Sequence, residues 1–455
     1  MKHALQHTLR HELRLILRAR LSLAALVLLL VLTSIAVWSG LQETARQRQT
    51  IDRLAVLNEQ DVAALAARLK VTPEGGYSAY YTFYNTWDAP SNTAFLALGL
   101  RDVAPYVMRI RALGLHAQLY DGENFNPEVA LPGRFDFAFV LIYLAPLFAI
   151  ALLHDLVSGE RQSGRLRMLA AMPGGAGMWR WRVALRFGLL FACLAVPVLA
   201  GVIAASAGFA AAGLVLAVTG AYLAFWTGLA LLVGKLGWRT VTNATALMGA
   251  WAVLTLVLPA LANVALTRAI PVHQGVDLML AQRELVHGAW EVPRAETMRK
   301  FYAGHPAWQD SAPLPATFHW KWLFAFNQLG DEGVAGQARD YRAGLVARQA
   351  WTDRLGALLP GVGAQAVLHR LANTDLPAQL AYQDSTAAFH RAMREFYYGY
   401  LFNERPFGVA DFARRPAFKP DAVEARLPWG AACASILLGC LVLLAGMWRL
   451  GRLRL

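Results

Sequence analysis

The chain has 455 residues, of which 56% are hydrophobic and 16% charged, and its formal net charge is +13. This hydrophobic content is too high for an ordinary soluble protein. The basic residues lie beside long apolar runs, where anionic lipid headgroups and a cytoplasmic partner explain them better than nucleic acid does. We therefore expect an integral membrane protein that binds the lipid bilayer and no nucleic acid.

Six apolar runs are long enough to cross the hydrocarbon core of a bilayer, which needs about 20 residues of helix. Their lengths and the charged stretches between them predict an all-α integral membrane protein with six transmembrane helices and a largely helical extracytoplasmic domain. The runs cover residues 21–38, 136–154, 187–207, 213–234, 243–266 and 428–448.

The charges beside these runs are distributed asymmetrically. Four short stretches contain 16 of the 43 Lys and Arg residues but only three acids, so they carry the whole net charge. Lys and Arg are retained on the cytoplasmic side during membrane insertion. We therefore expect a bacterial inner-membrane protein with both termini in the cytoplasm and with segments 40–134 and 267–427 outside. The four basic stretches are 1–20, 155–186, 235–239 and 449–455.

Residues 1–20 have the pattern of an amphipathic helix, with Leu5, Leu9 and Leu13 on one face and arginines around the other. Such a helix lies flat on the inner leaflet before the first span at 21–38. The alternative is that these residues act only as an orientation signal.

Three histidines in this segment recur at the helical spacing i, i+4 and i+8. One face of a helix would then present three imidazoles to a metal ion. No carboxylate or cysteine completes the set, so the sequence favours interfacial polar residues and no metal site. The three are His3, His7 and His11.

The first external segment, 40–134, begins with apolar residues at helical spacing as far as Leu69, which predicts that the first span continues outward. A cluster of aromatic residues follows Gly75 and Gly76. At the outer edge of the second span, 136–154, Arg134 and Asp136 have opposite charges. Either they form a local ion pair that caps this span, or they act as a gate.

The cytoplasmic segment 155–186 is charged in its first part, then amphipathic, and the helix it predicts stops at Pro173. A rigid helix between two spans is a lever, because whatever binds it can move both. The spacing of Gly159 and Gly164 loosely imitates a phosphate-binding loop. However, the phosphate-binding Lys and the Mg-binding Ser or Thr are missing, so we expect no nucleotide site.

Spans three to five occupy 187–266, and their many small residues let helices approach closely. The second external segment, 267–427, is large enough for a domain of its own. Its periodicity predicts helices at 276–302, 333–358, 364–372 and 376–402, with Thr374 or Asp375 as an N-cap. Its many aromatic residues act as core and interface anchors or line a path for an apolar cargo. Residues 428–455 form the sixth span and a basic tail.

Motifs for chemistry are missing from the sequence. It contains no HExxH, GxSxG or paired-cysteine motif, and the spans hold almost no ionisable residues. An intramembrane protease or a proton-coupled carrier normally needs polar groups in mid-membrane. We therefore expect a protein that is not an enzyme and that contains no catalytic residue, metal or cofactor.

The segment Glu160-Arg161-Gln162-Ser163-Gly164-Arg165-Leu166, followed by a Leu-rich turn and Pro173, resembles the cytoplasmic coupling helix of type-2 ATP-binding-cassette (ABC) permeases. Arg165 replaces the Thr that is usual in that motif. The Asn126-Pro127 pair, the stretch 133–147 and the stretch 368–375 are similar to a subgroup of these permeases with a large periplasmic insertion before the last span.

This resemblance implies a permease subunit, most often an exporter, that pairs with a second copy or a homologous permease. A separate cytoplasmic ATPase would hydrolyse ATP with Mg, and the coupling segment would transmit the motion. The residues implied in ATPase coupling are Glu160, Arg161, Gly164, Arg165, Leu166, Leu169 and Pro173.

Two rival functions stay open at this point. In the first, the chain is a mechanotransmitter: ATP hydrolysis reshapes the external domain, which acts on a periplasmic partner while nothing crosses the bilayer. In the second, it is a receptor or scaffold without an ATPase. The sequence does not identify a cargo, and lipid, peptide, siderophore-like and metal-related molecules are all compatible with it.

Overall fold

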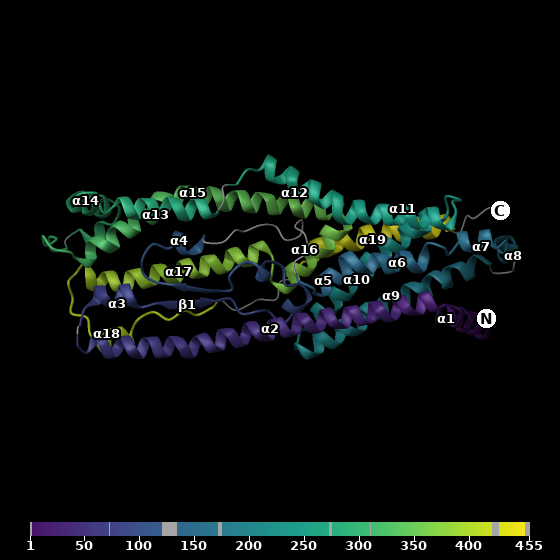
Figure 1. Cartoon of the computed structure of the whole chain (residues 1–455), viewed down its shortest axis with the longest axis horizontal. Helices are drawn as coiled ribbons and strands as arrows, with labels where there is room; N and C mark the ends of the chain where they lie inside the picture. The colour runs from purple at the N-terminus through teal and green to yellow at the C-terminus, as the bar shows by residue number, and fades with distance from the viewer. Residues whose placement is uncertain are drawn as a thin grey trace.

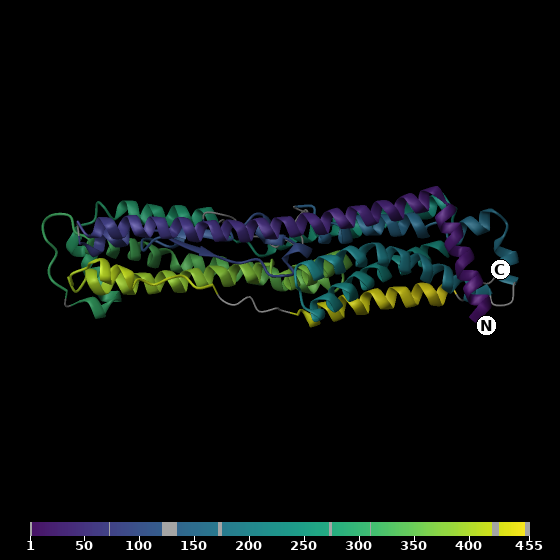
Figure 2. The ribbon, with the colours of Figure 1, turned by 90° about the horizontal axis from the view of Figure 1, so that it is seen from below.

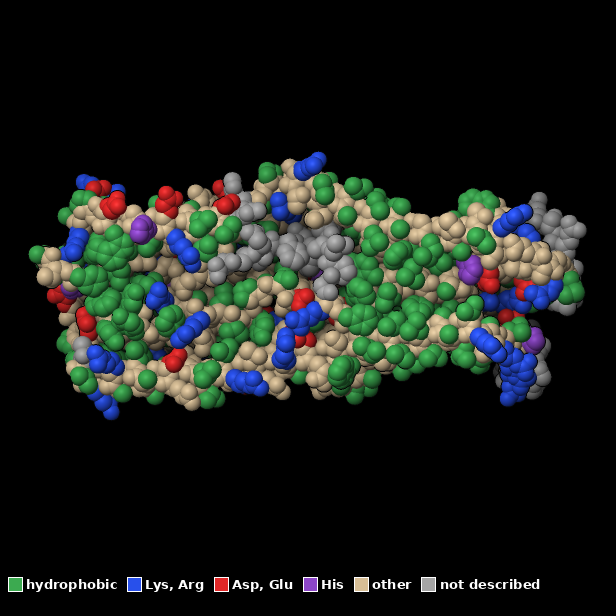
Figure 3. Space-filling model, viewed as in Figure 1, with side chains coloured by type: hydrophobic (Ala, Val, Ile, Leu, Met, Phe, Trp, Pro, Cys, Tyr) green, Lys and Arg blue, Asp and Glu red, His purple; other side chains and the backbone are tan. Residues whose placement is uncertain are grey.

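The computed structural model is 77% helical with almost no sheet, which confirms the predicted helical class. The elements form a long rod, with the apolar helices in one half and more polar helices in the other (Figures 1 and 3). We call these halves the span bundle and the distal domain. The structure describes residues 2–71, 73–120, 134–171, 175–272, 275–309, 311–420 and 427–450.

Six helices in the described ranges are long and apolar enough to cross a membrane, and each overlaps one of the six predicted runs. Hydrophobic side chains cover the visible face of this half of the rod, whereas charged side chains gather at its end and over the distal domain (Figure 3). The helices are Arg20–Leu69, Phe137–Gln162, Met178–Ala204, Phe209–Gly234, Thr240–Ala269 and Trp429–Trp448.

The first apolar helix, α2 (Arg20–Leu69), continues far beyond the span bundle. Its 50 residues correspond to a length of about 75 Å, and it runs along the edge of the rod into the distal domain (Figure 1). The predicted continuation of the first apolar helix as far as Leu69 is therefore confirmed. The preceding helix, α1 (Lys2–Arg18), crosses the end of α2 at a steep angle (Figure 2).

The centre of the span bundle is α10 (Phe209–Gly234), which packs along α19 (Trp429–Leu450). Glycines permit this close approach. A Cβ atom on Gly228 would lie 2.4 Å from the carbonyl oxygen of Val442, and one on Gly439 would lie 2.2 Å from that of Ala221. Small residues at helix crossings let backbones meet in this way.

The second and fifth apolar helices each contain one π-helical turn. The second consists of α5 (Phe137–Phe139), the π turn η3 (Val140–Leu144) and α6 (Ala145–Leu153), followed by the segment that ends at Gln162. The fifth consists of α11 (Thr240–Ala252), the π turn η4 (Val253–Val257) and α12 (Leu258–Ala269).

A proline follows each π turn, and it explains the change in hydrogen bonding. Pro146 has no N–H to give to the carbonyl of Ile142, and the Tyr222 hydroxyl donates to that oxygen instead at 2.8 Å. The indole of Trp251 donates to the neighbouring carbonyl of Tyr143 at 3.1 Å. These bonds from other helices satisfy backbone groups that an apolar surrounding would leave unpaired.

The distal domain combines the outer part of α2 with helices from both predicted external segments. Predicted helix 276–302 is two helices, and predicted helix 333–358 begins earlier, at Trp320. Asp375 caps α17, because its side chain accepts a hydrogen bond from the Ala378 N–H at 3.1 Å. The helices are α3 (Gly75–Tyr81), α13 (Gly275–Gly288), α14 (Arg294–Gly304), α15 (Trp320–Gly356), α17 (Leu376–Leu401) and α18 (Val409–Ala413).

A small antiparallel sheet lies in this domain and was not predicted. Its strands β1 (Tyr84–Trp87) and β2 (Val107–Ile110) pair Tyr84 with Ile110 and Trp87 with Val107. Each strand has only four residues, too few for the alternation of polar and apolar residues to stand out in the sequence. The hydroxyls of Thr86 and Tyr382 lie 3.0 Å apart and connect the sheet to α17.

Helix α16 (Pro360–Ala372) joins the two halves. All but one of its 13 residues are buried, and it contacts α10 and α19 of the span bundle as well as α15 of the distal domain. At its C-terminus Asn373 adopts a left-handed conformation with φ of 57°, and the hydroxyls of Ser91 and Thr93 donate to the carbonyls of Ala372 and Leu371, each at 2.6 Å. Residues far apart in sequence thus cap this helix.

Asp331 holds the interior of the distal domain together. Its carboxylate accepts from the backbone N–H of Leu115 at 2.8 Å and pairs with Arg394 at 2.8 Å and His116 at 3.4 Å. Burial alone would raise the pKa of Asp331, but the bond from His116, the charge of Arg394 and the backbone N–H together lower it to about 2. This residue therefore stays ionised and links β2 and the following loop to α15 and α17.

The buried side chain of His390 is expected to make the stability of the folded chain depend on pH. Burial and the neighbouring Arg394 lower its pKa from 6.5 to about 3, although Asp331 acts in the opposite direction, and its Nε2 lies 2.7 Å from the carbonyl oxygen of Leu113. Between these values the unfolded chain binds a proton that the folded chain does not, so stability falls as pH drops from 6.5 toward 3.

We expect the melting temperature of the purified full chain to fall more steeply over this pH range in wild type than in a His390→Gln variant, which retains a donor for the Leu113 carbonyl. Thermal unfolding followed at several pH values measures the two slopes. Equal slopes would show that His390 is not buried in its neutral form.

Candidate functional site

The predicted coupling segment forms two short helices at the end of the span bundle opposite the distal domain. They are α7 (Ser158–Gln162) and α8 (Leu166–Ala171), and they lie at the same end as α1 and both termini (Figure 1). We call residues 158–171 the tip. Gly164 connects them with φ of 72°, a conformation that a residue with a Cβ adopts only at a cost. Pro173 lies outside the described residues.

Arg182 attaches this tip to two other parts of the bundle. It lies on α9 (Gly175–Ala204), and its guanidinium pairs with Glu160 at 3.0 Å and with Glu12 of α1 at 2.8 Å. Only 10% of the Arg182 side chain is exposed, so solvent screens these pairs weakly. One arginine therefore connects α1, α7 and α9.

Hydrogen bonds also attach the tip to the start of the fifth apolar helix. The Thr240 hydroxyl donates to Ser158 Oγ at 3.0 Å and to Gln162 Oε1 at 3.1 Å. Asn243 donates to the carbonyl of His154 at 3.5 Å. Gly237, just before this helix, also lies close to the tip, because a Cβ atom added to it would be 3.5 Å from Arg161 Nη1. A force on the tip would thus reach the second, third and fifth apolar helices together.

The side chains implied in coupling differ in where they point. Glu160 faces inward to Arg182, and Leu166 packs against the core of the bundle. Arg165 is 61% exposed and reaches back to Glu160 at 2.9 Å. Leu169 and Arg161 are half-buried.

Three residues important to the tip were missed in the sequence. Glu12 and Arg182 are separated by 170 positions, so no local spacing relates them. Met168 was passed over because the neighbouring leucines matched the coupling pattern. Its side chain is nevertheless 56% exposed, the largest such fraction among the apolar tip side chains that the structure describes.

The structure also places the other candidates from the sequence. Arg134 pairs with Glu43 and Asp102, not with Asp136. Asp136 instead caps α5 by accepting from the Phe139 N–H at 2.9 Å, and it accepts from the Leu98 N–H at 2.8 Å. The cap exists, but a local ion pair does not form it.

No group of three His, Cys, Asp or Glu side chains suited to a metal ion occurs within the described residues. The side chains of His3 and His7 lie outside them, so the interpretation of the histidine face stays a prediction. The cysteines Cys193, Cys433 and Cys440 are free.

Comparison with known proteins gives one match. A family model described as a domain of unknown function, DUF3526, matches residues 276–421, which lie largely in the distal domain. Neither a curated protein nor a solved structure matches the chain.

Because Arg182 holds the tip through its ion pairs, we expect that reversing the charge of its partner Glu160 loosens the tip locally. A Glu160→Lys variant places a second cation beside Arg182, so we expect faster hydrogen exchange in 155–171 while exchange in α10 is unchanged. The control Arg165→Gln removes only an exposed pair, which contributes less than about 1 kcal/mol. Equal protection of 155–171 in the charge-reversal variant and wild type would mean that Arg182 does not hold the tip.

Proposed function

We propose that this chain is the membrane-spanning permease subunit of an ABC transporter, acting as an exporter and driven by a separate cytoplasmic ATPase. The observation that carries the proposal is the attachment of the tip 158–171 to three apolar helices and α1. A partner that pushes on a tip held in this way moves several spans at once, whereas a loosely attached loop would absorb the motion.

The orientation follows from charge. The tip and both chain ends gather the excess Lys and Arg, which favours the cytoplasmic side of a bacterial inner membrane, and the distal domain then lies outside the membrane. Helix α1 would lie along the inner leaflet, because it crosses the end of α2 instead of continuing it. ATP and Mg would bind the partner ATPase.

A second permease copy, or a homologous permease, would cover the most exposed apolar helices. Only 11% of the fifth apolar window and 22% of the sixth are buried within one chain, compared with 78% of the fourth. Lipid covers part of this surface. The fifth helix also receives the bonds from the tip, so motion there would pass directly to a neighbouring subunit.

A mechanotransmitter is the second candidate, and the connection between the two halves favours it. Helix α2 runs without a break from the span bundle into the distal domain, and α16 packs into the core of the span bundle while it also contacts α15. Movement of the spans would therefore displace the distal domain, which would act on a periplasmic partner. The π turns η3 and η4 both contact α16, and such turns often mark functional positions.

Met168 provides the test that addresses the ATPase directly. In proteoliposomes containing the chain and an ABC ATPase encoded beside it, a Met168→Glu variant is expected to reduce the chain-dependent stimulation of ATP hydrolysis at least tenfold. The physical reason is that a carboxylate would enter an apolar contact without a partner. A Leu57→Glu variant, which changes an exposed apolar residue on the outer part of α2 away from the span bundle, serves as the control. Undiminished stimulation in the Met168 variant would contradict the proposed contact.

A further inference from the structure

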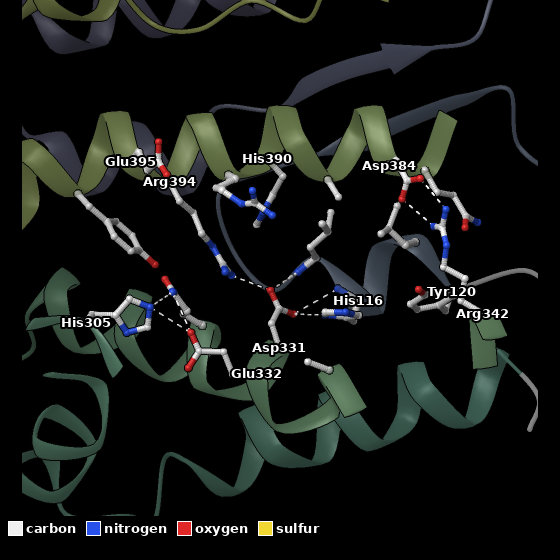
Figure 4. Close-up of a pocket in the computed structure, with 18 of the residues that line it drawn as sticks. His116, Tyr120, His305, Asp331, Glu332, Arg342, Asp384, His390, Arg394 and Glu395 are labelled. Carbon is white, nitrogen blue, oxygen red and sulfur yellow. Dashed lines mark hydrogen bonds and ion pairs between the residues drawn. The ribbon is translucent and has the colours of Figure 1, made fainter. Parts of the chain in front are cut away.

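The distal domain contains a cavity of about 560 Å³ that the proposed function does not use. It lies between α15 and α17 (Figure 4), and residues of α4 (His116–Leu119) and of the turn η5 (Pro306–Trp308) also line it. This volume is in the range of sites that bind small molecules.

Acidic and basic side chains alternate along its wall. Arg394 pairs with Asp331 at 2.8 Å, and His305 lies 3.1 Å from Glu332 (Figure 4). Farther along, Arg342 makes two bonds to Asp384, at 2.6 and 2.5 Å. These pairs cancel one another, so they shape the wall without giving the cavity a strong charge of either sign.

Two further charged residues stand at this cavity with no ion-pair partner in the described ranges. They are Arg391 and Glu395, both exposed, one turn apart on α17. Deeper in the wall, Gln328 Oε1 and Arg394 Nε are buried with no hydrogen-bond partner among the described residues. Polar atoms of this kind are costly unless something satisfies them.

Apolar surface completes the cavity. Leu115, Leu119 and Tyr120 line one end, and Trp308 and Tyr398 line the other. A ligand that fits must therefore have an apolar body as well as polar groups.

We propose that this cavity binds a short peptide with free termini. An ion of one sign would meet as much repulsion as attraction from the mixed wall. A zwitterion avoids this conflict, because its carboxylate can approach Arg391 while its ammonium approaches Glu395. The peptide's amides would supply donors and acceptors to Gln328 and Arg394, and its side chains would contact the apolar ends. The inference is independent of whether the chain transports anything.

The test uses trialanine, whose only charges are its termini, and its N-acetylated, C-amidated form, which has none. Isothermal titration of the full chain in detergent should give saturable binding of trialanine at millimolar concentration. We expect the capped peptide to bind at least tenfold more weakly, because it cannot pair with either charge.

Variants of the chain locate the site. Arg391→Gln and Glu395→Gln should each weaken trialanine binding roughly two- to fivefold, since each removes one exposed charge pair. Both side chains are exposed, so folding is expected to persist. Arg339→Gln, an exposed position on α15 that does not line the cavity, should leave binding unchanged. Failure of trialanine to bind, equal binding of the capped peptide, or unchanged binding in both cavity variants would each overturn the proposal.

Discussion

The architecture depends on the requirement that backbone groups in an apolar surrounding find hydrogen-bond partners within the protein. Helix α2 satisfies its backbone groups by its own helical hydrogen bonds over its apolar part, without interruption. It then continues as one helix to the far end of the distal domain. Where Pro146 breaks the pattern, Tyr222 supplies the missing donor from another helix. The spans are therefore stiff and mutually connected, so displacement at one end of the rod reaches the other.

Two buried contacts make that connection specific. At the tip, Arg182 gathers Glu12 and Glu160 into one cluster, so α1 and the coupling segment move with the third apolar helix. At the junction, α16 packs on the span bundle while Ser91 and Thr93, from the segment between α2 and α5, cap its end. These contacts support either transport or force transmission, because both need the spans and the distal domain to respond to the same push.

The sequence predicted the features that depend on composition over many residues. All six apolar helices, the extension of α2 and a cap at Thr374 or Asp375, which the structure places at Asp375, follow from length, periodicity and local capping chemistry. It did not predict contacts between distant positions. The Arg182 cluster joins residues 170 positions apart, and the distal cavity depends on Asp331 meeting Arg394, 63 positions away. Opposite charges are common on any chain, so only the fold identifies which ones meet.

The central claim is that displacement of the tip reaches the distal domain. The most direct test of it is to measure the distance between the outer ends of α2 in two copies of the chain. A single nitroxide at Gln60, in chains whose native cysteines are replaced, reports it by electron double resonance in the complex with the ATPase. The account predicts that trapping ATP shifts this distance in complexes with an intact tip but not in complexes that carry Glu160→Lys. An unchanged distance in every nucleotide state would contradict it.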